Sequence, residues 1–232
     1  MNSLTPDSIS KLLATTIPSF QLTCEDSLNL GFGFIFYGLA RTLRPRHVVV
    51  IGSKAGFAPV CFALALKDNV GHTISSVGCG TTCLSHPQER GLVSFIDPSY
   101  SIHRGDIGHS YGIGTWDTPS STTTIFEDHG VASVVTHYKM TSATYLQTHT
   151  NDGGIDLLYI DGDHSYEGIM HDLTEFRPHL NPGAFVLAHD VAPDLEDSEG
   201  HEVLRDLPEG MYDVVTIPIS PGLAIMRPCD GQ

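Results

Sequence analysis

Basic residues are scarce in this sequence, and no run of them occurs anywhere. The chain has 12 Lys and Arg against 27 Asp and Glu, which gives a formal net charge of −15 at pH 7. A field of this sign repels phosphate backbones and anionic lipid headgroups. We therefore expect neither nucleic acid nor a membrane as a partner.

Long apolar runs are also absent. No stretch approaches the roughly 18 apolar residues of a membrane-spanning helix. The first twenty residues lack the basic start and the continuous apolar middle of a signal peptide. These absences lead us to expect a cytoplasmic protein.

The five cysteines are odd in number and irregular in spacing, so we expect no disulfide framework. Cys79 and Cys83, with His72 and His86 nearby, leave a zinc site open. They do not form a Cys-x-x-Cys pair and no second pair exists, so a polar loop with two thiols is the preferred interpretation.

The sequence does contain alternating strand and helix patterns. Residues 47–51 form a β-branched run typical of a strand buried on both faces. A glycine turn at 52–56 follows, and then apolar residues at the spacing of a helix. Further strands are predicted at residues 92–96, 131–138, 155–160 and 184–188, and a closing antiparallel hairpin at 212–219 and 223–226.

This order predicts a doubly wound α/β fold with a mostly parallel sheet and helices on both faces. We expect a single domain over residues 1–232. Residues 1–27 form an N-terminal lead-in with a short helix at 7–16. Residues 99–130 show little periodicity and are interpreted as a lid or substrate loop.

Ligands of such sheets bind beyond the carboxyl ends of the strands. Asp161 and Asp163 follow one buried strand, and Asp190 follows the strand predicted beside it. Converging carboxylates repel one another unless a cation or a proton separates them, so we predict a divalent cation there. In the alternative, Asp163 caps the next helix and Asp161 is a solvated loop residue.

The residues after two further strands are candidates for binding a nucleotide. Gly52 and Gly56 allow close approach of a ligand to the backbone, although a plain tight turn is the alternative. Asp97 is suited to accept hydrogen bonds from a ribose, or else it starts a turn before Pro98. Lys54 stands where a dinucleotide fingerprint has its middle glycine, which argues against a dehydrogenase.

Several motifs resemble class I S-adenosylmethionine-dependent methyltransferases. They are the run IDLLYIDGDHSYEG at 155–168, Asp172, LNPG at 180–183 and His189-Asp190. The sequence is most similar to the small-molecule O-methyltransferase branch, which includes macrolide-sugar O-methyltransferases and cephalosporin-hydroxylase-like proteins. The resemblance implies a Rossmann-like methyltransferase fold with seven strands, of which the last is antiparallel.

The resemblance also implies roles for particular residues. S-adenosylmethionine would be bound by Gly52, Ser53, Gly56, Asp97, Met140, Thr141 and Asp161. A divalent cation, Mg²⁺ or Mn²⁺, would be held by Asp161, His189 and Asp190. Asp163 matches the place of a general base, with His164 beside it. Here Val50 replaces an acidic residue usual before the glycine turn, and His189 replaces one carboxylate of the metal set.

The function predicted by this resemblance is metal-assisted O-methylation of a small hydroxylated molecule. Two alternatives stay open. A metal-dependent hydrolase would use the same Asp and His residues without an adenosyl cofactor. A non-catalytic binding protein would retain the fold with a degenerate site. The acceptor is not readable from the sequence, and a homo-oligomer remains possible.

Overall fold

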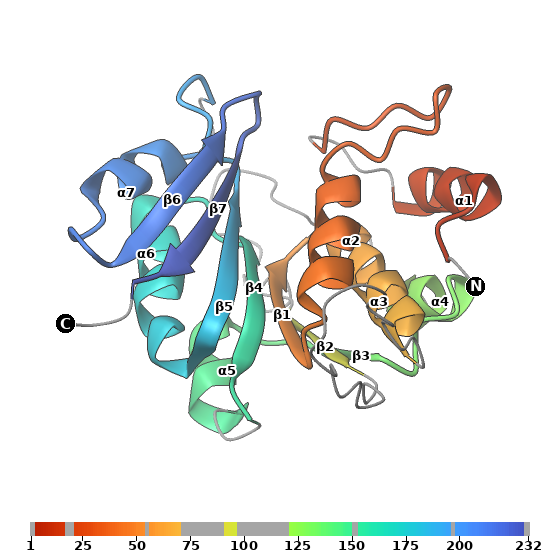
Figure 1. Ribbon diagram of the computed structural model, residues 1–232, viewed down its shortest axis with the longest axis horizontal. Helices are drawn as coiled ribbons and strands as arrows, with labels where there is room; N and C mark the ends of the chain where they lie inside the picture. Colours follow the sequence, from red (N-terminus) through yellow and green to blue (C-terminus); the bar gives the residue numbers. More distant parts are fainter. Residues whose placement is uncertain are drawn as a thin grey trace, which may run out of the picture.

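The computed structural model describes residues 3–16, 21–53, 56–70, 91–96, 121–149, 153–195 and 198–229. Its centre is a sheet of seven strands in the order β3-β2-β1-β4-β5-β7-β6 (Figure 1). The strands are β1 (His47–Gly52), β2 (Leu92–Ile96), β3 (Val135–Tyr138), β4 (Ile155–Asp161), β5 (Leu180–His189), β6 (Tyr212–Ile217) and β7 (Leu223–Pro228).

Strands β1 to β5 pair with one another in parallel, whereas β7 is antiparallel to both β5 and β6. The predicted doubly wound sheet with an antiparallel last strand is therefore confirmed. The predicted closing hairpin is also present, as β6 and β7.

Helices cover the sheet on both faces (Figure 1). One side carries α2 (Phe32–Leu43) and α3 (Phe57–Asn69), with α1 (Pro6–Thr16) and α4 (Ser121–Asp128) packed beside them. The other side carries α5 (Ser142–His149), α6 (Tyr166–Glu175) and α7 (Gly200–Asp206).

Each central strand supplies side chains to both layers, because successive side chains of a strand point to opposite faces. Val48 and Val50 of β1 pack in the core under α2 and α3. Val49 and Ile51 pack in the core under α5 and α6. This explains why the strand reads as a continuous apolar run.

Three predicted boundaries were wrong. The strand predicted from residue 131 begins at Val135, since Val131 and Val134 belong to a turn whose side chains enter the core. Residues 121–128 form α4 and not part of a loop. The strand predicted at 184–188 is longer, since β5 begins at Leu180 and its register opposite β4 is irregular near that end. Residues 72–86 with their two cysteines, and the rest of the predicted lid up to 120, lie outside the described residues.

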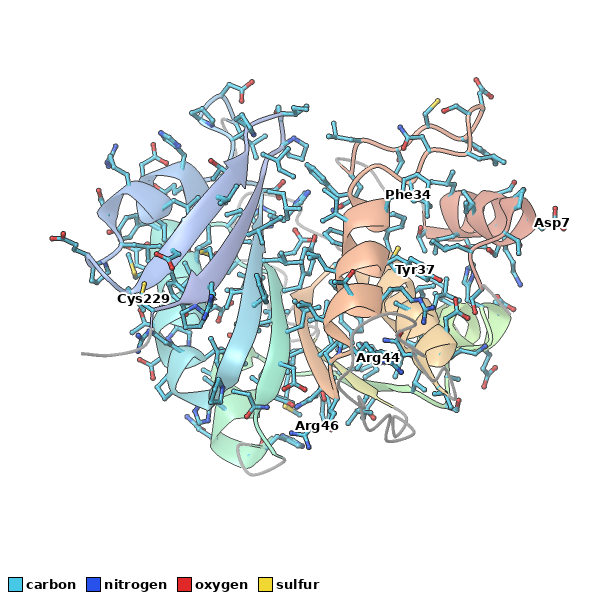
Figure 2. The ribbon with its side chains drawn as sticks, viewed as in Figure 1. Asp7, Phe34, Tyr37, Arg44, Arg46 and Cys229 are labelled. Atoms are coloured by element: carbon cyan, nitrogen blue, oxygen red, sulfur yellow. The ribbon has the colours of Figure 1, made fainter. Side chains whose placement is uncertain are left out.

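The N-terminal lead-in is docked onto the sheet layers. Leu12 and Leu13 of α1 are buried in the core. The backbone N–H and the hydroxyl of Ser3 each donate a 2.7 Å hydrogen bond to the carboxylate of Asp68. Tyr37 of α2, labelled in Figure 2, donates a 2.6 Å hydrogen bond to the same carboxylate.

Among the described ranges, no helix combines the length and the apolar character needed to cross a bilayer.

Candidate functional site

The carboxyl ends of β1, β4 and β5 meet at one edge of the sheet. Gly52 of β1 pairs with Asp161 of β4. Ile160 pairs with Ala188, so that Asp161 stands beside His189 at the end of β5. This arrangement places the glycine turn and the acidic motifs at adjoining positions.

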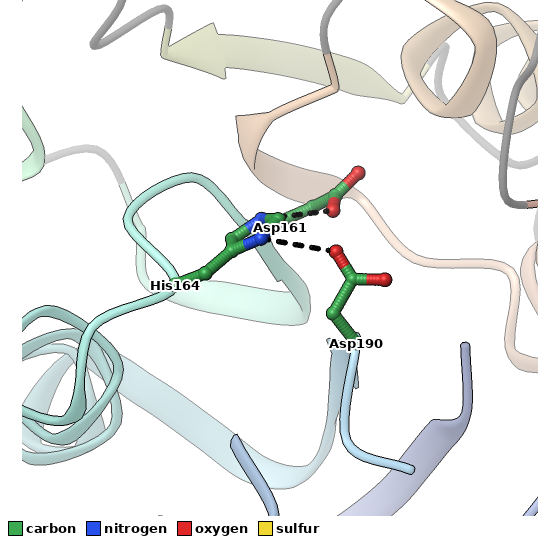
Figure 3. A group of neighbouring side chains, drawn as sticks. All are labelled: Asp161, His164 and Asp190. Atoms are coloured by element: carbon green, nitrogen blue, oxygen red, sulfur yellow. Dashed lines mark ion pairs between the residues drawn. The ribbon is translucent and has the colours of Figure 1, made fainter. Parts of the chain in front are cut away.

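Asp161, His164 and Asp190 converge at this edge (Figure 3). The Nδ1 atom of His164 lies 3.1 Å from Oδ2 of Asp190, and its Nε2 atom lies 3.6 Å from Oδ1 of Asp161. One ligand atom from each of the three side chains falls within 4.8 Å of the others. The predicted convergence of the two carboxylates is present, with the imidazole of His164 between them.

His189 lies against the same carboxylates but deeper in the protein. Its Nδ1 atom is 2.8 Å from Oδ1 of Asp190 and 3.2 Å from Oδ1 of Asp161. Its side chain is 1% exposed, whereas that of His164 is 19% exposed. Neither contact of Nδ1 has the directional geometry of a hydrogen bond, and Nε2 has no hydrogen-bond partner among the described residues. The contacts of His189 are therefore ionic.

Opposite charges shift the pKa values of this cluster. Burial opposes protonation of His189, but the charges of Asp161 and Asp190 outweigh it and raise its pKa to about 10. Burial likewise opposes protonation of His164, whose pKa is nevertheless raised by the same two carboxylates. Burial would raise the pKa of Asp161, but the two histidines hold it below its ordinary value. The raised pKa of His189 and the lowered pKa of Asp161 favour an ion pair between these two side chains at the base of the cluster.

The backbone at Asp190 is in the left-handed region, with φ of 58°. This conformation costs an L-residue roughly 1–2 kcal/mol. Two contacts hold it: the Asp190 N–H donates to the carbonyl of Gly222, and the hydroxyl of Ser198 donates to the Asp190 carbonyl. Strained backbone that is held by several surrounding contacts is common at functional sites.

Asp163 does not join the cluster. Its carboxylate accepts a 3.0 Å hydrogen bond from the backbone N–H of Ser165, the N-cap residue of α6. The carboxylate also packs against Gly168 in the first turn of the helix. The structure thus places Asp163 at the N-terminus of α6, as in the capping alternative.

The glycine turn leads from β1 into α3. Gly52 has a φ of 74°, and a Cβ at this position would lie 2.0 Å from the carbonyl oxygen of Asp161. The absence of a side chain at Gly52 is therefore required by the neighbouring strand. The hydroxyl of Ser53 accepts a hydrogen bond from the N–H of Ala58, and Gly56 (φ 83°) is the N-cap residue of α3.

The remaining predicted cofactor residues follow outer strands. Met140 and Thr141 come after β3, and the Thr141 hydroxyl accepts a hydrogen bond from the N–H of Thr144 at the start of α5. Asp97 and Lys54 lie outside the described residues. Among the described residues, Asp161, His164 and Asp190 make up the converging group, to which neither Met140 nor Thr141 belongs.

Three residues at the site were not predicted from the sequence. The hydroxyl of Tyr159 donates a 3.0 Å hydrogen bond to Oδ2 of Asp161. Gln21 donates to the Tyr159 hydroxyl at 3.5 Å, and the ring of Phe32 meets that of His189 edge-on at 5.7 Å between centroids. Gln21 belongs to the lead-in, and Tyr159 looks like an ordinary core residue of a strand, so neither carries a local signal.

The donor set fits a divalent cation. Two carboxylates and one imidazole offer mixed oxygen and nitrogen ligands, which suit Mn²⁺, Fe²⁺ or Zn²⁺ better than Mg²⁺. Two anions held this close also need a positive charge between them, which protonated histidine supplies in the metal-free cluster.

The fold and the site together define an α/β protein that binds ligand at the carboxyl edge of a doubly wound sheet. A family model described as a methyltransferase domain matches residues 49–191, which is more than half of the chain. The chain belongs to this family, and the resemblance to class I S-adenosylmethionine-dependent methyltransferases is confirmed.

Solved structures of methyltransferases share the fold. The SAH-bound methyltransferase PaMTH1 of Podospora anserina has a TM-score of 0.64 and 15% identity, over 97% of this chain and 89% of that one. The O-methyltransferase TomG of Streptomyces achromogenes, involved in tomaymycin synthesis and solved with SAM, has a TM-score of 0.59 and 15% identity, over 97% and 89%. An O-methyltransferase of Bacillus cereus in complex with SAH has a TM-score of 0.61 and 11% identity, over 96% and 91%.

A curated relative is also similar in sequence. The Sinorhizobium fredii protein named Uncharacterized protein y4gI is 26% identical over 159 residues, which cover 66% of this chain. The chain spans only 14% of the length of that relative.

Proposed function

We propose that the protein is an S-adenosylmethionine-dependent O-methyltransferase that acts on a small hydroxylated molecule with the help of a bound divalent cation. The observation that carries this proposal is the convergence of Asp161, His164 and Asp190 next to the glycine turn. Family membership supports methyl transfer. Two of the similar structures are named O-methyltransferases with SAM or SAH bound, which supports the cofactor and the oxygen acceptor.

The proposed cation ligands are Asp161, His164 and Asp190. His164 replaces His189 in the set expected from the resemblance, because His189 is almost completely buried and its Nδ1 already faces both carboxylates. His189 instead balances the negative charge of Asp161 and Asp190 from the buried side of the site. The cofactor would be bound by Gly52, Ser53, Gly56, Asp97, Met140 and Thr141, with Asp161 at the boundary of the two ligands.

S-adenosylmethionine would supply the methyl group, and the cation would supply the charge that lowers the pKa of a bound substrate hydroxyl. The protein's own residues then act mainly by positioning the reactants. Asp161 and Asp190 fix the point at which the substrate oxygen is held. The strained turn at Asp190 keeps its carboxylate aimed at that point.

A metal-free route to the same reaction rests on His164. Its Nδ1 atom is 3.1 Å from Asp190, so the imidazole is oriented by a carboxylate in the manner of a general base. Asp163, the other proposed base, is occupied at the N-terminus of α6. In this route the deprotonated form of His164 accepts the proton of the substrate hydroxyl, and no cation is required.

Calorimetry with S-adenosylmethionine, in the presence and absence of Mn²⁺, tests the proposal first. We expect saturable binding of the cofactor, and Mn²⁺ binding that Asp161→Asn weakens at least tenfold. The matched control is Asp213→Asn on the exposed face of β6, which removes the same charge away from the site. Equal Mn²⁺ affinity in both variants would exclude the proposed cation site.

Transfer of labelled methyl groups to a panel of catechols, sugars and other hydroxylated acceptors tests the activity itself. Turnover that requires Mn²⁺ supports the cation, and turnover that persists with a chelator but is lost in His164→Ala supports the metal-free route. Cofactor binding without turnover on any acceptor would favour a binding protein. Hydrolysis without cofactor binding would favour the hydrolase.

A further inference from the structure

Asp161 presents its two carboxylate oxygens to different partners. Oδ1 faces His189 and His164, at 3.2 and 3.6 Å. Oδ2 accepts the 3.0 Å hydrogen bond from the hydroxyl of Tyr159. The phenol therefore holds one oxygen and leaves the other for the cluster.

Gln21 contacts the oxygen of the same phenol from the N-terminal segment. Its Nε2 atom donates to the Tyr159 oxygen at 3.5 Å, and both side chains are buried. An amide nitrogen only donates, so the phenol oxygen is the acceptor in this contact. The phenol proton is then available to Asp161 alone.

The backbone that carries Gln21 is itself held in place. Phe32 N–H donates to the carbonyl of Gln21, and Cys24 and Asn29 exchange two 2.8 Å backbone hydrogen bonds. Gly31 has a φ of 52°, and a Cβ there would lie 1.9 Å from the Gln21 carbonyl oxygen. Residues 21–31 thus form a closed loop that ends at the Phe32 ring beside His189.

We propose that Gln21 is a positioning residue of the site, which acts through Tyr159 to orient the carboxylate of Asp161. The loop of residues 21–31 is accordingly a wall of the site, although it precedes the matched methyltransferase region at 49–191. The effect on a bound cation rests on the function proposed above, whereas the orientation of Asp161 does not.

A double-mutant cycle on the full chain tests this relay, that is, the action of Gln21 through Tyr159 on Asp161. Mn²⁺ affinity is measured by calorimetry for the wild type, Gln21→Met, Tyr159→Phe and the double variant. We expect each single change to weaken Mn²⁺ binding roughly three- to tenfold, and the double variant to bind no more weakly than Tyr159→Phe, since Gln21 acts only through the hydroxyl. Ser3→Ala, which removes a different anchor of the N-terminal segment, is the control and should bind Mn²⁺ like the wild type.

A second readout separates failure of the relay from failure of the cation site. The imidazole ¹⁵N resonances of His189 report on Asp161 without any metal. We expect them to shift similarly in Gln21→Met and Tyr159→Phe, with no further shift in the double variant. Additive effects, unchanged His189 resonances, or an equal effect of Ser3→Ala would each overturn the proposal. If the wild type binds no Mn²⁺, the cation site is wrong, and the resonances alone decide the relay.

Discussion

At the scale of single residues, the site consists of two histidines and two carboxylates whose charges act on one another across short distances. Asp161 and Asp190 raise the pKa of His189 to about 10 and also raise the pKa of His164, while the two histidines lower the pKa of Asp161. A divalent cation held by Asp161 and Asp190 would supply part of the positive charge that the histidines supply here. His164 is the more exposed of the two histidines, with 19% of its side chain exposed against 1% for His189.

Asp163 and His164 are adjacent in sequence but lie in different environments, which gives the first prediction. Asp163→Asn keeps an oxygen that can accept from the N–H of Ser165, so the start of α6 should persist. We expect it to retain methyl transfer within about threefold, whereas His164→Ala loses at least about a hundredfold, as removal of a general base or metal ligand does. Steady-state kinetics of both variants check this, and a large loss in Asp163→Asn would restore Asp163 as the base.

Asp172 supplies a prediction on stability. This carboxyl of α6 is 2% exposed, its Oδ1 has no hydrogen-bond partner among the described residues, and burial raises its pKa to about 6. Because the folded pKa is above the unfolded one, the folded state binds the proton more tightly. The stability contributed by protonation is complete below about pH 4 and is lost as the pH rises through about 6.

Asp172→Asn removes this dependence while it keeps the shape of the side chain. At pH 7.5 we expect the variant to be more stable than the wild type by up to roughly 3 kcal/mol, from a shift of about two pKa units. At pH 4 the two should be equal. Urea unfolding at both pH values measures the difference, and an identical difference at both would show that ionisation of Asp172 is not the cause.

At the scale of elements, a glycine that precedes α2 and a glycine inside α2 differ in whether a side chain could be added. Gly31 has a positive φ and no room for a Cβ beside the Gln21 backbone, whereas Gly38 lies within α2 with no atom within 4 Å of an added Cβ. We expect Gly31→Ala to destabilise the protein by roughly 2 kcal/mol or more. Gly38→Ala should stabilise it by about 0.5–1 kcal/mol, since alanine is the better helix former.

Thermal unfolding of the pair gives the comparison directly. Gly31→Ala should also weaken Mn²⁺ binding, because the loop carries Gln21, and Gly38→Ala should not. Equal stability of the two variants would mean that the loop of residues 21–31 adjusts without cost.

The elements near the site could be predicted to different degrees. The β-branched run of β1 and the motif at the end of β4 predicted buried parallel strands, and parallel strands bring their carboxyl ends to one edge; hence Asp161 and Asp190 were expected together. The choice between His164 and His189 depends on depth in the protein, which no periodicity encodes. Gln21 and Tyr159 are 138 residues apart, and their contact arises only when the lead-in packs against the sheet.

At the scale of the whole molecule, ligand binding should appear in the unfolding temperature. A cation that binds only the folded state stabilises it by about 2.7 kcal/mol at a hundredfold excess over Kd. We expect Mn²⁺ to raise the Tm of the wild type by several degrees and a chelator to reverse the rise, with no rise in Asp161→Asn. Differential scanning calorimetry measures these Tm values. An equal rise of the Tm in Asp161→Asn would place the cation elsewhere on this strongly acidic protein.

The pairing of Gly52 with Asp161 has a consequence for the protein as a two-ligand system. Gly52 lies directly against the backbone of Asp161, the proposed cation ligand, so a shift of one strand end would act on the other. Ligands at the two positions then share a free energy of interaction. If the cofactor changes the affinity for the cation by some factor, the cation must change the affinity for the cofactor by the same factor. Titrations performed in either order should therefore give the same product of the two dissociation constants.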